Sequence, residues 1–290
     1  MTTERPDPRL NAYRTDLASD KLKGVVDAKK FVEGHLQEVV VAKAPLKGAP
    51  RFDAPLDTEV IFGEHVLVLD EQGGWAWVQS LSDGYVGYVQ SEILADPKAP
   101  ASHTVKAPST FIYPGPDIKL PPIGQLPMNA RCAFEGGTGE FAELAGGGYV
   151  FAKHLAGQAG NADHFTDIAK NFVGTPYLWG GRTYSGIDCS GLVQMAMIAA
   201  GEKCLRDTDM QENSIGALLA HDAGRTDLAK GDLIFWGGHV GIMVDAEHLL
   251  HANAYHMQTV IEPYEEARLR IAAGDTGEVR TIRRPSLKVA

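Results

Sequence analysis

The sequence changes from a glycine-rich loop to an apolar helix between Val173 and Gly201, in the stretch VGTPYLWGGRTYSGIDCSGLVQMAMIAAG. Closely spaced glycine and proline residues are typical of a loop. After Asp188, apolar residues recur at helical spacing, and Gly201 is a suitable end for a helix. We therefore expect Cys189 in the first turn of a buried helix. Unpaired backbone N–H groups and the positive end of the helix dipole favour a thiolate there, which predicts a nucleophilic cysteine.

A cysteine beside a helix can also be a small buried hydrophobic residue. Two features favour a reactive thiol instead. Its neighbours Asp188 and Ser190 are small and polar, which suits a cleft, and the preceding loop carries aromatic residues such as Tyr177 that suit a substrate wall. The loop has neither the Gly-Lys-Ser/Thr of a P-loop nor a G-x-G-x-x-G pattern, so we exclude a phosphate or dinucleotide cradle.

Length and composition limit the class of protein. The chain of 290 residues suits two or three domains, and its 44% hydrophobic and 22% charged residues are ordinary for a globular protein. A formal charge of −10 argues against nucleic acid or an anionic membrane as partner. We recognise no secretory signal and no stretch long enough to cross a membrane. A sparse, odd set of cysteines suits a reducing compartment, so we expect a cytoplasmic protein.

The N-terminal half divides by pattern into three segments. In residues 1–36, the spacing of apolar residues after Ser19 and Asp20 predicts an amphipathic helix that packs against a neighbouring domain. Residues 37–97 contain five short β runs with Gly-Gly and Asp-Gly hairpin signals, which predict a small barrel. Residues 98–158 repeat this unit more loosely, since Gly-Tyr-Val at 87–89 recurs 61 residues later at 148–150.

Residues 159–290 form the expected catalytic domain. A helix is predicted from Phe165 to Val173, followed by the Cys189 helix. Strands are predicted at Gly231–Trp236, His239–Val244 and Leu249–Ala254. Helices followed by an antiparallel sheet indicate an α+β domain.

A nucleophilic cysteine needs a base, and the base needs an orienting partner. His239 follows a Gly-Gly turn at the start of one predicted strand, and His251 lies on the next. A turn at residues 245–248 would place His239 opposite Ala254. To place it opposite His251, the strands need a tighter turn at residues 244–246 or a β-bulge.

A metal site built from histidines is the alternative chemistry that composition permits. His239, His248, His251 and His256 lie close in sequence, but there is no H-E-x-x-H motif and no cysteine pair at zinc spacing. We therefore expect no metal and no cofactor. Cys132 and Cys204 have no histidine-bearing context, so we expect them to be structural.

The runs Gly174–Gly181, Asp188–Gly191 and Gly238–Ile242 together resemble the NlpC/P60 cysteine peptidases. His251–Met257 and Val260–Pro263 resemble the subgroup with N-terminal bacterial SH3 (SH3b) modules. That subgroup hydrolyses the γ-D-glutamyl–diaminopimelate bond of murein peptides. The resemblance implies an α+β, papain-like catalytic domain preceded by two small all-β SH3b-like barrels.

The N-terminal modules resemble SH3b domains through Gly63-Glu64, the tryptophan pair Trp75 and Trp77, and D-G-Y-V-G-Y-V. Such modules often bind peptide or wall polymer. Their aromatic residues can also simply fill a core. We expect a core role for Trp77 and Tyr149, whereas binding remains open for Trp75 and Tyr85, which lie near turns.

The resemblance also implies a role for each site residue. Cys189 forms a thioester with the substrate, His239 protonates the leaving amine and then activates water, and His251 orients the His239 ring. The Cys189 backbone N–H and a donor from the Tyr177 loop are the candidate oxyanion site. The substrate contacts implied are Tyr177, Asp188 and Ser190 in the cleft, Glu64 and Tyr85 around a free N-terminal L-alanine amine, and Asp207 and Thr208 at the diaminopimelate end.

An enzyme with such an amine cap would accept only peptides already released from sugar, which suits wall recycling in the cytoplasm. Two other functions fit the sequence. One is an amidase or acyltransferase of the same papain-like superfamily. The other is a wall-peptide binding protein without catalysis, although the intact Cys, His, His set argues against it.

Overall fold

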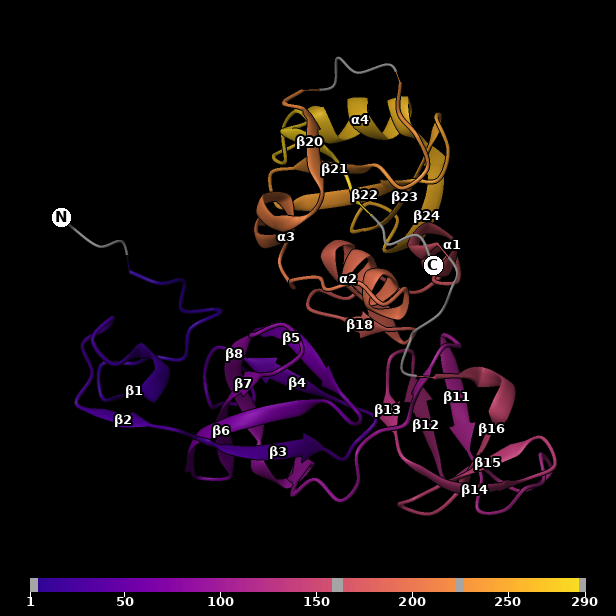
Figure 1. Ribbon diagram of the computed structural model, residues 1–290. Helices are drawn as coiled ribbons and strands as arrows, with labels where there is room; N and C mark the ends of the chain where they lie inside the picture. Colours follow the sequence, from indigo (N-terminus) through magenta and orange to yellow (C-terminus); the bar gives the residue numbers. More distant parts are fainter. Residues whose placement is uncertain (1–4, 158–163, 223–226, 287–290) are drawn as a thin grey trace. The chain divides into compact units, whose positions relative to one another are not determined.

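The structure is a computed structural model that describes residues 5–157, 164–222 and 227–286. Contacts divide the chain into two compact units, Met1–Leu155 and Ala156–Ala290 (Figure 1). The boundary expected between residues 158 and 159 lies outside the described residues. Within the described part of the chain, no helix is both long and apolar enough to cross a membrane.

The N-terminal unit contains one large sheet in the order β5-β4-β8-β7-β6-β3-β9 (Figure 1). Its strands are β3 (His35–Val39), β4 (Lys43–Lys47), β5 (Leu56–Ile61), β6 (His65–Gln72), β7 (Trp75–Ser80), β8 (Val86–Gln90) and β9 (Leu94–Ala95). Each of the five expected runs overlaps a strand, although Val40, Val41, Phe62 and Tyr85 lie just outside the strand bounds. The hydrogen-bonded order is linear, with β5 and β9 at its edges, so the small barrel that we expected is open.

Strand β4 was not predicted, because its apolar residues Ala44 and Leu46 alternate with lysine and proline. Both side chains are buried, and Leu46 packs against β8. A Cβ atom at Gly87 would lie 2.1 Å from a methyl carbon of Leu46. Glycine at that position is therefore a packing requirement rather than a turn signal.

The expected N-terminal helix is not formed. The segment instead contains β1 (Leu17–Ser19), the 3-10 turn η1 (Asp20–Leu22) and β2 (Lys30–Val32), and β1 pairs with β2 in parallel. Gly24, with φ +83°, and the β-branched Val25 and Val26 interrupt helical propensity. The segment does pack as expected against a neighbour, since Ala12 and Leu17 share a core cluster with Leu69 and Trp77 of the large sheet.

The rest of the N-terminal unit is made of small sheets and repeats part of the first module. The strands are β10 (His103–Val105), β11 (Ser109–Ile112), β12 (Gly124–Pro127), β13 (Arg131–Cys132), β14 (Phe134–Thr138), β15 (Phe141–Leu144), β16 (Tyr149–Phe151) and β17 (Leu155–Gly157). The succession β8, η2 (Ser91–Ile93), β9 recurs as β16, η3 (Ala152–His154), β17. The recurrence falls at the spacing of 61 residues seen in the sequence.

The C-terminal unit has the expected α+β order. Helices α1 (Phe165–Lys170), α2 (Cys189–Ala199) and α3 (Thr208–Ser214) precede an antiparallel sheet in the order β20-β25-β21-β22-β23-β24, and α4 (Tyr264–Ala272) lies between β24 and β25 in the chain (Figure 1). The sheet strands are β20 (Ala217–Ala220), β21 (Leu233–Trp236), β22 (His239–Met243), β23 (His248–Asn253), β24 (Gln258–Pro263) and β25 (Thr281–Arg284). The short hairpin β18 (Arg182–Thr183) and β19 (Gly186–Ile187) belongs to the glycine-rich loop before α2.

Helix α2 is the buried centre of this unit. Every residue except Ile198 is buried, and the helix packs against α1, β22 and β23. Its first turn also touches the glycine-rich loop, because a Cβ atom at Gly191 would lie 2.4 Å from the carbonyl oxygen of Gly181. The start of α2 is thereby held between the loop and the strands that carry the two histidines.

Candidate active site

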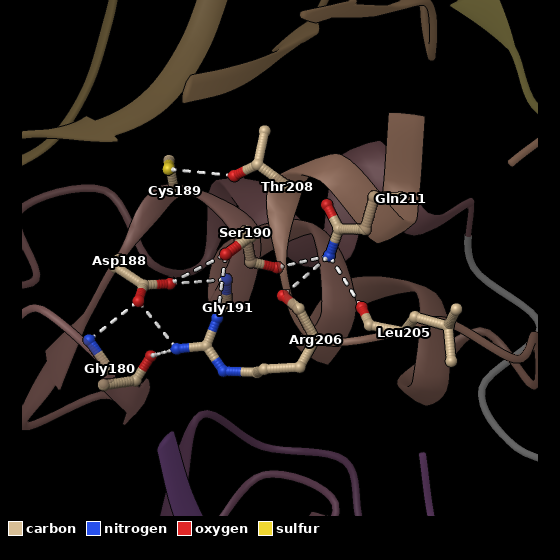
Figure 2. Close-up of polar contacts among 10 residues, drawn as sticks. Gly180, Asp188, Cys189, Ser190, Gly191, Leu205, Arg206, Thr208 and Gln211 are labelled. Carbon is tan, nitrogen blue, oxygen red and sulfur yellow. Dashed lines mark hydrogen bonds and ion pairs between the residues drawn. The ribbon is translucent and has the colours of Figure 1, made fainter. Parts of the chain in front are cut away.

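Cys189 is the first residue of α2, as expected from the sequence. Asp188 caps the helix, and its carboxylate accepts a hydrogen bond from the backbone N–H of Gly191 at 2.7 Å. The cysteine is 6% exposed. Its sulfur lies 3.9 Å from Oγ1 of Thr208 (Figure 2). The sulfur also accepts a hydrogen bond from the backbone N–H of Val240. These are the partners of the sulfur among the described residues.

The charge state expected for this sulfur is corrected by the structure. Burial, together with the nearby negative charge of Asp188, raises the pKa of the Cys189 thiol to about 11. The hydrogen bonds from Val240 and Thr208 lower the pKa but do not outweigh burial. The helix start alone therefore does not ionise the sulfur, and the thiol must give its proton to a base during the reaction.

The two expected histidines are hydrogen-bonded to each other. Nε2 of His239 lies 2.8 Å from Nδ1 of His251. The strand register differs from both expected alternatives, because Val244 N–H donates to His248 and Ile242 pairs with Leu250. This register places His251 opposite Gly241, and the imidazoles meet diagonally on one face of the sheet. The connecting turn spans residues 245–247, so neither the turn at residues 244–246 nor a β-bulge is needed.

A carboxylate and a guanidinium extend this contact. Nε2 of His251 lies 2.7 Å from Oε1 of Glu262 on β24. Both carboxylate oxygens of Glu262 accept hydrogen bonds from Arg270 on α4, at 2.5 and 2.7 Å. Burial, His251 and Arg270 together lower the pKa of His239, which makes its ring a neutral base. Sequence reasoning missed Glu262 and Arg270, since their roles depend on strand pairing and helix packing.

The other side of the cysteine is built around a buried ion pair. Arg206 Nη2 donates to Oδ2 of Asp188 at 2.6 Å, and its Nη1 donates to Oγ of Ser190 at 2.8 Å (Figure 2). The Arg206 side chain is 1% exposed, and burial of its charge is outweighed by Asp188, which raises the arginine pKa. Gln211 of α3 donates to the carbonyl oxygens of Ser190 and Leu205. Asp188 and Ser190 thus position the helix start, while their substrate contacts remain predictions.

The remaining substrate contacts expected in the C-terminal unit are Tyr177, Asp207 and Thr208. Tyr177 is half-buried, and burial together with the negative charge of Asp188 raises the pKa of its hydroxyl. Its backbone N–H donates to Met257, so the hydroxyl is the group it can offer to a substrate. Thr208 places its buried hydroxyl toward the sulfur, whereas Asp207 is half-buried just before α3.

Glu64 and Tyr85 belong to the N-terminal unit, and both are buried. Oε2 of Glu64 accepts a hydrogen bond from the backbone N–H of Ile61 at 3.0 Å, which stabilises the turn between β5 and β6. Trp75, for which binding was also open, is 9% exposed. The capping of a substrate amine by Glu64 and Tyr85 remains a prediction.

The two further histidines that could have joined a metal site, His248 and His256, each contact a side chain of their own strand or loop. His248 contacts Asp245 at 3.0 Å, and His256 contacts Oδ1 of Asn253 at 3.1 Å. Across residues 5–157, 164–222 and 227–286, no group of three or more His, Cys, Asp or Glu residues is arranged to hold a metal ion.

Comparison with known proteins places this geometry in a family. The NlpC/P60 family profile matches residues 174–271, and the bacterial dipeptidyl-peptidase SH3 domain profile matches residues 46–94. The chain is 30% identical, over 69% of its length and 73% of the relative, to the gamma-D-glutamyl-L-lysine dipeptidyl-peptidase of Bacillus subtilis. The chain belongs to the NlpC/P60 family. It is accordingly a hydrolase of the cysteine peptidase class, as the sequence predicted.

Two further comparisons agree with membership of the NlpC/P60 family. Dipeptidyl-peptidase 6 of Lysinibacillus sphaericus is 27% identical over 74% of this chain and 86% of that protein. The crystal structure of an NlpC/P60 family protein from Bacillus cereus superposes with a TM-score of 0.73, at 20% identity, over 87% of this chain and 99% of the other. The expected fold class, an NlpC/P60 domain after a strand-rich SH3-like region, is confirmed.

Proposed function

We propose that this chain is a cysteine endopeptidase that hydrolyses the γ-D-glutamyl–diaminopimelate bond of murein stem peptides with a free N-terminal L-alanine. The observation that carries the proposal is a buried thiol at the start of α2, hydrogen-bonded to the backbone of Val240 next to a pair of hydrogen-bonded histidines. The relative from Bacillus subtilis is named for a γ-D-glutamyl-L-lysine bond, which supports cleavage after a γ-linked D-glutamate. Comparing the two tripeptides as substrates tests whether lysine or diaminopimelate follows that bond.

In the proposed mechanism, His239 is the base. When substrate binds, the sulfur moves from Thr208 toward Nδ1 of His239, since catalytic hydrogen bonds often tighten only in the complex. The proton passes from Sγ to Nδ1 as sulfur attacks the amide carbonyl carbon. The tetrahedral intermediate expels the diaminopimelate amine, which takes the proton from His239 and leaves a thioester on Cys189. Water, deprotonated by His239, then releases the γ-carboxylate of D-glutamate and restores the thiol.

We assign two donors to the oxyanion of that intermediate. They are the backbone N–H of Cys189 at the helix start and the hydroxyl of Tyr177, whose pKa is raised by its surroundings. Removing one such donor costs about 10²- to 10³-fold in rate. Tyr177→Phe is therefore expected to lower kcat far more than it raises KM.

The proposal extends to the cellular role. An enzyme whose Glu64 and Tyr85 bind the free amine of L-alanine would accept peptides only after their release from sugar, which suits recycling of wall peptides in the cytoplasm. Three free, buried cysteines support a reducing compartment. Fractionation of cells followed by immunodetection of the untagged protein tests this location.

The decisive experiment is digestion of defined peptides followed by mass spectrometry. L-Ala-γ-D-Glu-diaminopimelate, its lysine analogue, the N-acetylated tripeptide and a sugar-linked stem peptide are compared. We expect release of free diaminopimelate from the first, little cleavage of the blocked peptides, inhibition by iodoacetamide and no inhibition by a chelator. Transfer of the acyl group to an added amine in preference to water would instead indicate an acyltransferase. Binding without cleavage, unaffected by iodoacetamide, would indicate a binding protein.

A further inference from the structure

The hydrogen bonds from His239 continue past His251 to a charged pair that family resemblance did not assign. Glu262 lies opposite Leu249 in the β23–β24 ladder, so it is diagonal to His251 on the same face of the sheet. Its side chain is 12% exposed, and Arg270 holds both of its oxygens. The Arg270 guanidinium in turn stacks 4.4 Å above the ring of Tyr255.

This carboxylate determines where the protons lie on both imidazoles. An ionised carboxylate only accepts hydrogen bonds, so Nε2 of His251 must carry the proton in its contact with Glu262. Neutral His251 then has a lone pair on Nδ1, which can accept only from Nε2–H of His239. Neutral His239 therefore keeps its own lone pair on Nδ1. The negative charge of Glu262 therefore leaves Nδ1 of His239 without a proton, so this atom can accept one.

The carboxylate stays ionised throughout the neutral pH range. Burial disfavours its charge, but hydrogen bonds from His251 and Arg270 outweigh burial and lower the pKa of Glu262 to about 2. The bidentate geometry of Arg270 also prevents rotation of the carboxylate away from His251. Arg270 thus acts on the histidines through Glu262.

We propose that Glu262, held by Arg270, is a positioning residue that sets the tautomers of His251 and His239 and makes Nδ1 of His239 the base. The inference rests on the proposed Cys-His-His mechanism, and it adds the group that orients the third member. Glu262 also favours the imidazolium that forms when His239 takes the thiol proton, because its negative charge raises the pKa of both rings.

Other charged or titratable groups act on the same pair and have to be kept constant. Arg270 lowers the pKa of both rings, and the second ring is also lowered by a neighbouring histidine. The groups that act on Glu262, on Arg270 or on the two rings come from β22, β23, the following loop and α4, and they are His239, His251, Tyr255, His256, Glu266 and Arg270. Single substitutions of Glu262 and Arg270 therefore predict pKa changes of opposite sign.

The test compares Glu262→Gln with Glu265→Gln, a matched control that breaks an exposed ion pair with Arg268 on the same helix. The amide introduced by Glu262→Gln can turn its NH₂ group toward His251, which reverses the proton order and blocks Nδ1 of His239. We expect kcat/KM for the tripeptide to fall about 10- to 100-fold through kcat, as for other partners that orient a histidine. Glu262→Asp should recover part of the loss, and Glu265→Gln should change neither constant.

Two readouts distinguish positioning from a merely structural role. The acidic limb of the pH profile of kcat/KM should move to lower pH in Glu262→Gln and to higher pH in Arg270→Gln. Nitrogen-15 NMR of labelled histidine should show Nε2–H tautomers for both rings in the parent enzyme and their loss in Glu262→Gln. The proposal would be overturned if the acidic limb moved in the same direction in Glu262→Gln and Arg270→Gln. It would also be overturned if the histidine tautomers were unchanged in Glu262→Gln.

Alkylation by iodoacetamide separates this inference from the proposed function. The rate at Cys189, followed by mass spectrometry at neutral pH, needs no peptide, and it should fall about tenfold in Glu262→Gln because the thiolate–imidazolium pair is less stable. If the parent enzyme does not cleave the tripeptide but this difference persists, the substrate assignment fails and the positioning role stands. Cleavage with equal alkylation rates in both variants would contradict the positioning role alone.

Discussion

Two arginine-bound carboxylates lie on either side of the proposed chemistry, and they differ in where their oxygens are directed. Asp188 accepts from Gly180 N–H, Gly191 N–H and Arg206, so its hydrogen bonds hold the backbone that presents the thiol. Glu262 accepts from Arg270 but also from a histidine ring. The first pair therefore maintains a geometry, and the second is connected to groups that exchange protons.

The two ion pairs also differ in how deeply their arginines are buried. Arg206 is 1% exposed and Arg270 is 26% exposed. A deeply buried ion pair destabilises the fold severely when one partner is removed, whereas solvent screens a partly exposed pair. The comparison predicts that changes at Asp188 and Arg206 affect stability first, and that changes at Glu262 and Arg270 affect activity first.

The largest effect is expected for Cys189→Ala, which tests whether the chemistry lies between the two pairs. Loss of the nucleophile should lower kcat/KM by at least about 10³-fold, since other site groups rarely replace it. Peptide binding, measured by isothermal titration calorimetry, should change little because the helix cap at Asp188 is intact. Turnover by Cys189→Ala would show that the reaction does not depend on the sulfur between the two pairs.

Arg206→Met should separate the pairs by stability. It leaves the Asp188 carboxylate buried without its cation, and such a loss costs about 3–5 kcal/mol. Arg270→Met should cost about 1 kcal/mol, because its charge is partly exposed. Chemical unfolding followed by tryptophan fluorescence measures both values. Equal losses in the two variants would show that burial does not distinguish the pairs.

The pH dependence of stability should reveal the charge of Glu262. Its pKa of about 2 in the folded state lies below the ordinary value of 4.5, so ionisation stabilises the fold. This contribution is complete above about pH 5 and is lost as the pH falls toward about 2. After screening we expect about 1–2 kcal/mol between Glu262→Gln and the parent at pH 6, decreasing on acidification. A difference that does not vary with pH would exclude this charge as its cause.

A third buried carboxylate, Glu64, provides the smallest expected effect and extends the comparison to the N-terminal unit. Glu64→Gln keeps an oxygen for the backbone N–H of Ile61 but removes the negative charge. If Glu64 binds the substrate amine, KM for the free tripeptide should rise about tenfold, with unfolding unchanged. Steady-state kinetics on free and N-acetylated peptides gives the answer. An unchanged KM would restrict Glu64 to a structural role.

Short-range sequence patterns predicted an element correctly where a chemically distinctive residue coincides with a regular spacing of apolar residues. The start of α2 at Cys189, the Gly-Gly turn before His239 and the strand that bears His251 follow from short-range signals. The recurrence of strand, 3-10 turn and strand at a spacing of 61 residues is also visible in the sequence. The N-terminal helix failed because a glycine with positive φ and adjacent β-branched residues act against an otherwise helical spacing.

By itself, the sequence determined the family, the α+β order of the C-terminal unit and the cysteine and histidines, because these depend on residue type and local spacing. Only the tertiary structure decided the diagonal register of His239 and His251, the pairing of Asp188 with Arg206, and the contact of Glu262 with His251 and Arg270. It also decided that burial raises the pKa of the Cys189 thiol, since burial depends on every element packed around the helix start. Desolvation and strand pairing are properties of the assembled core, and no single segment encodes them.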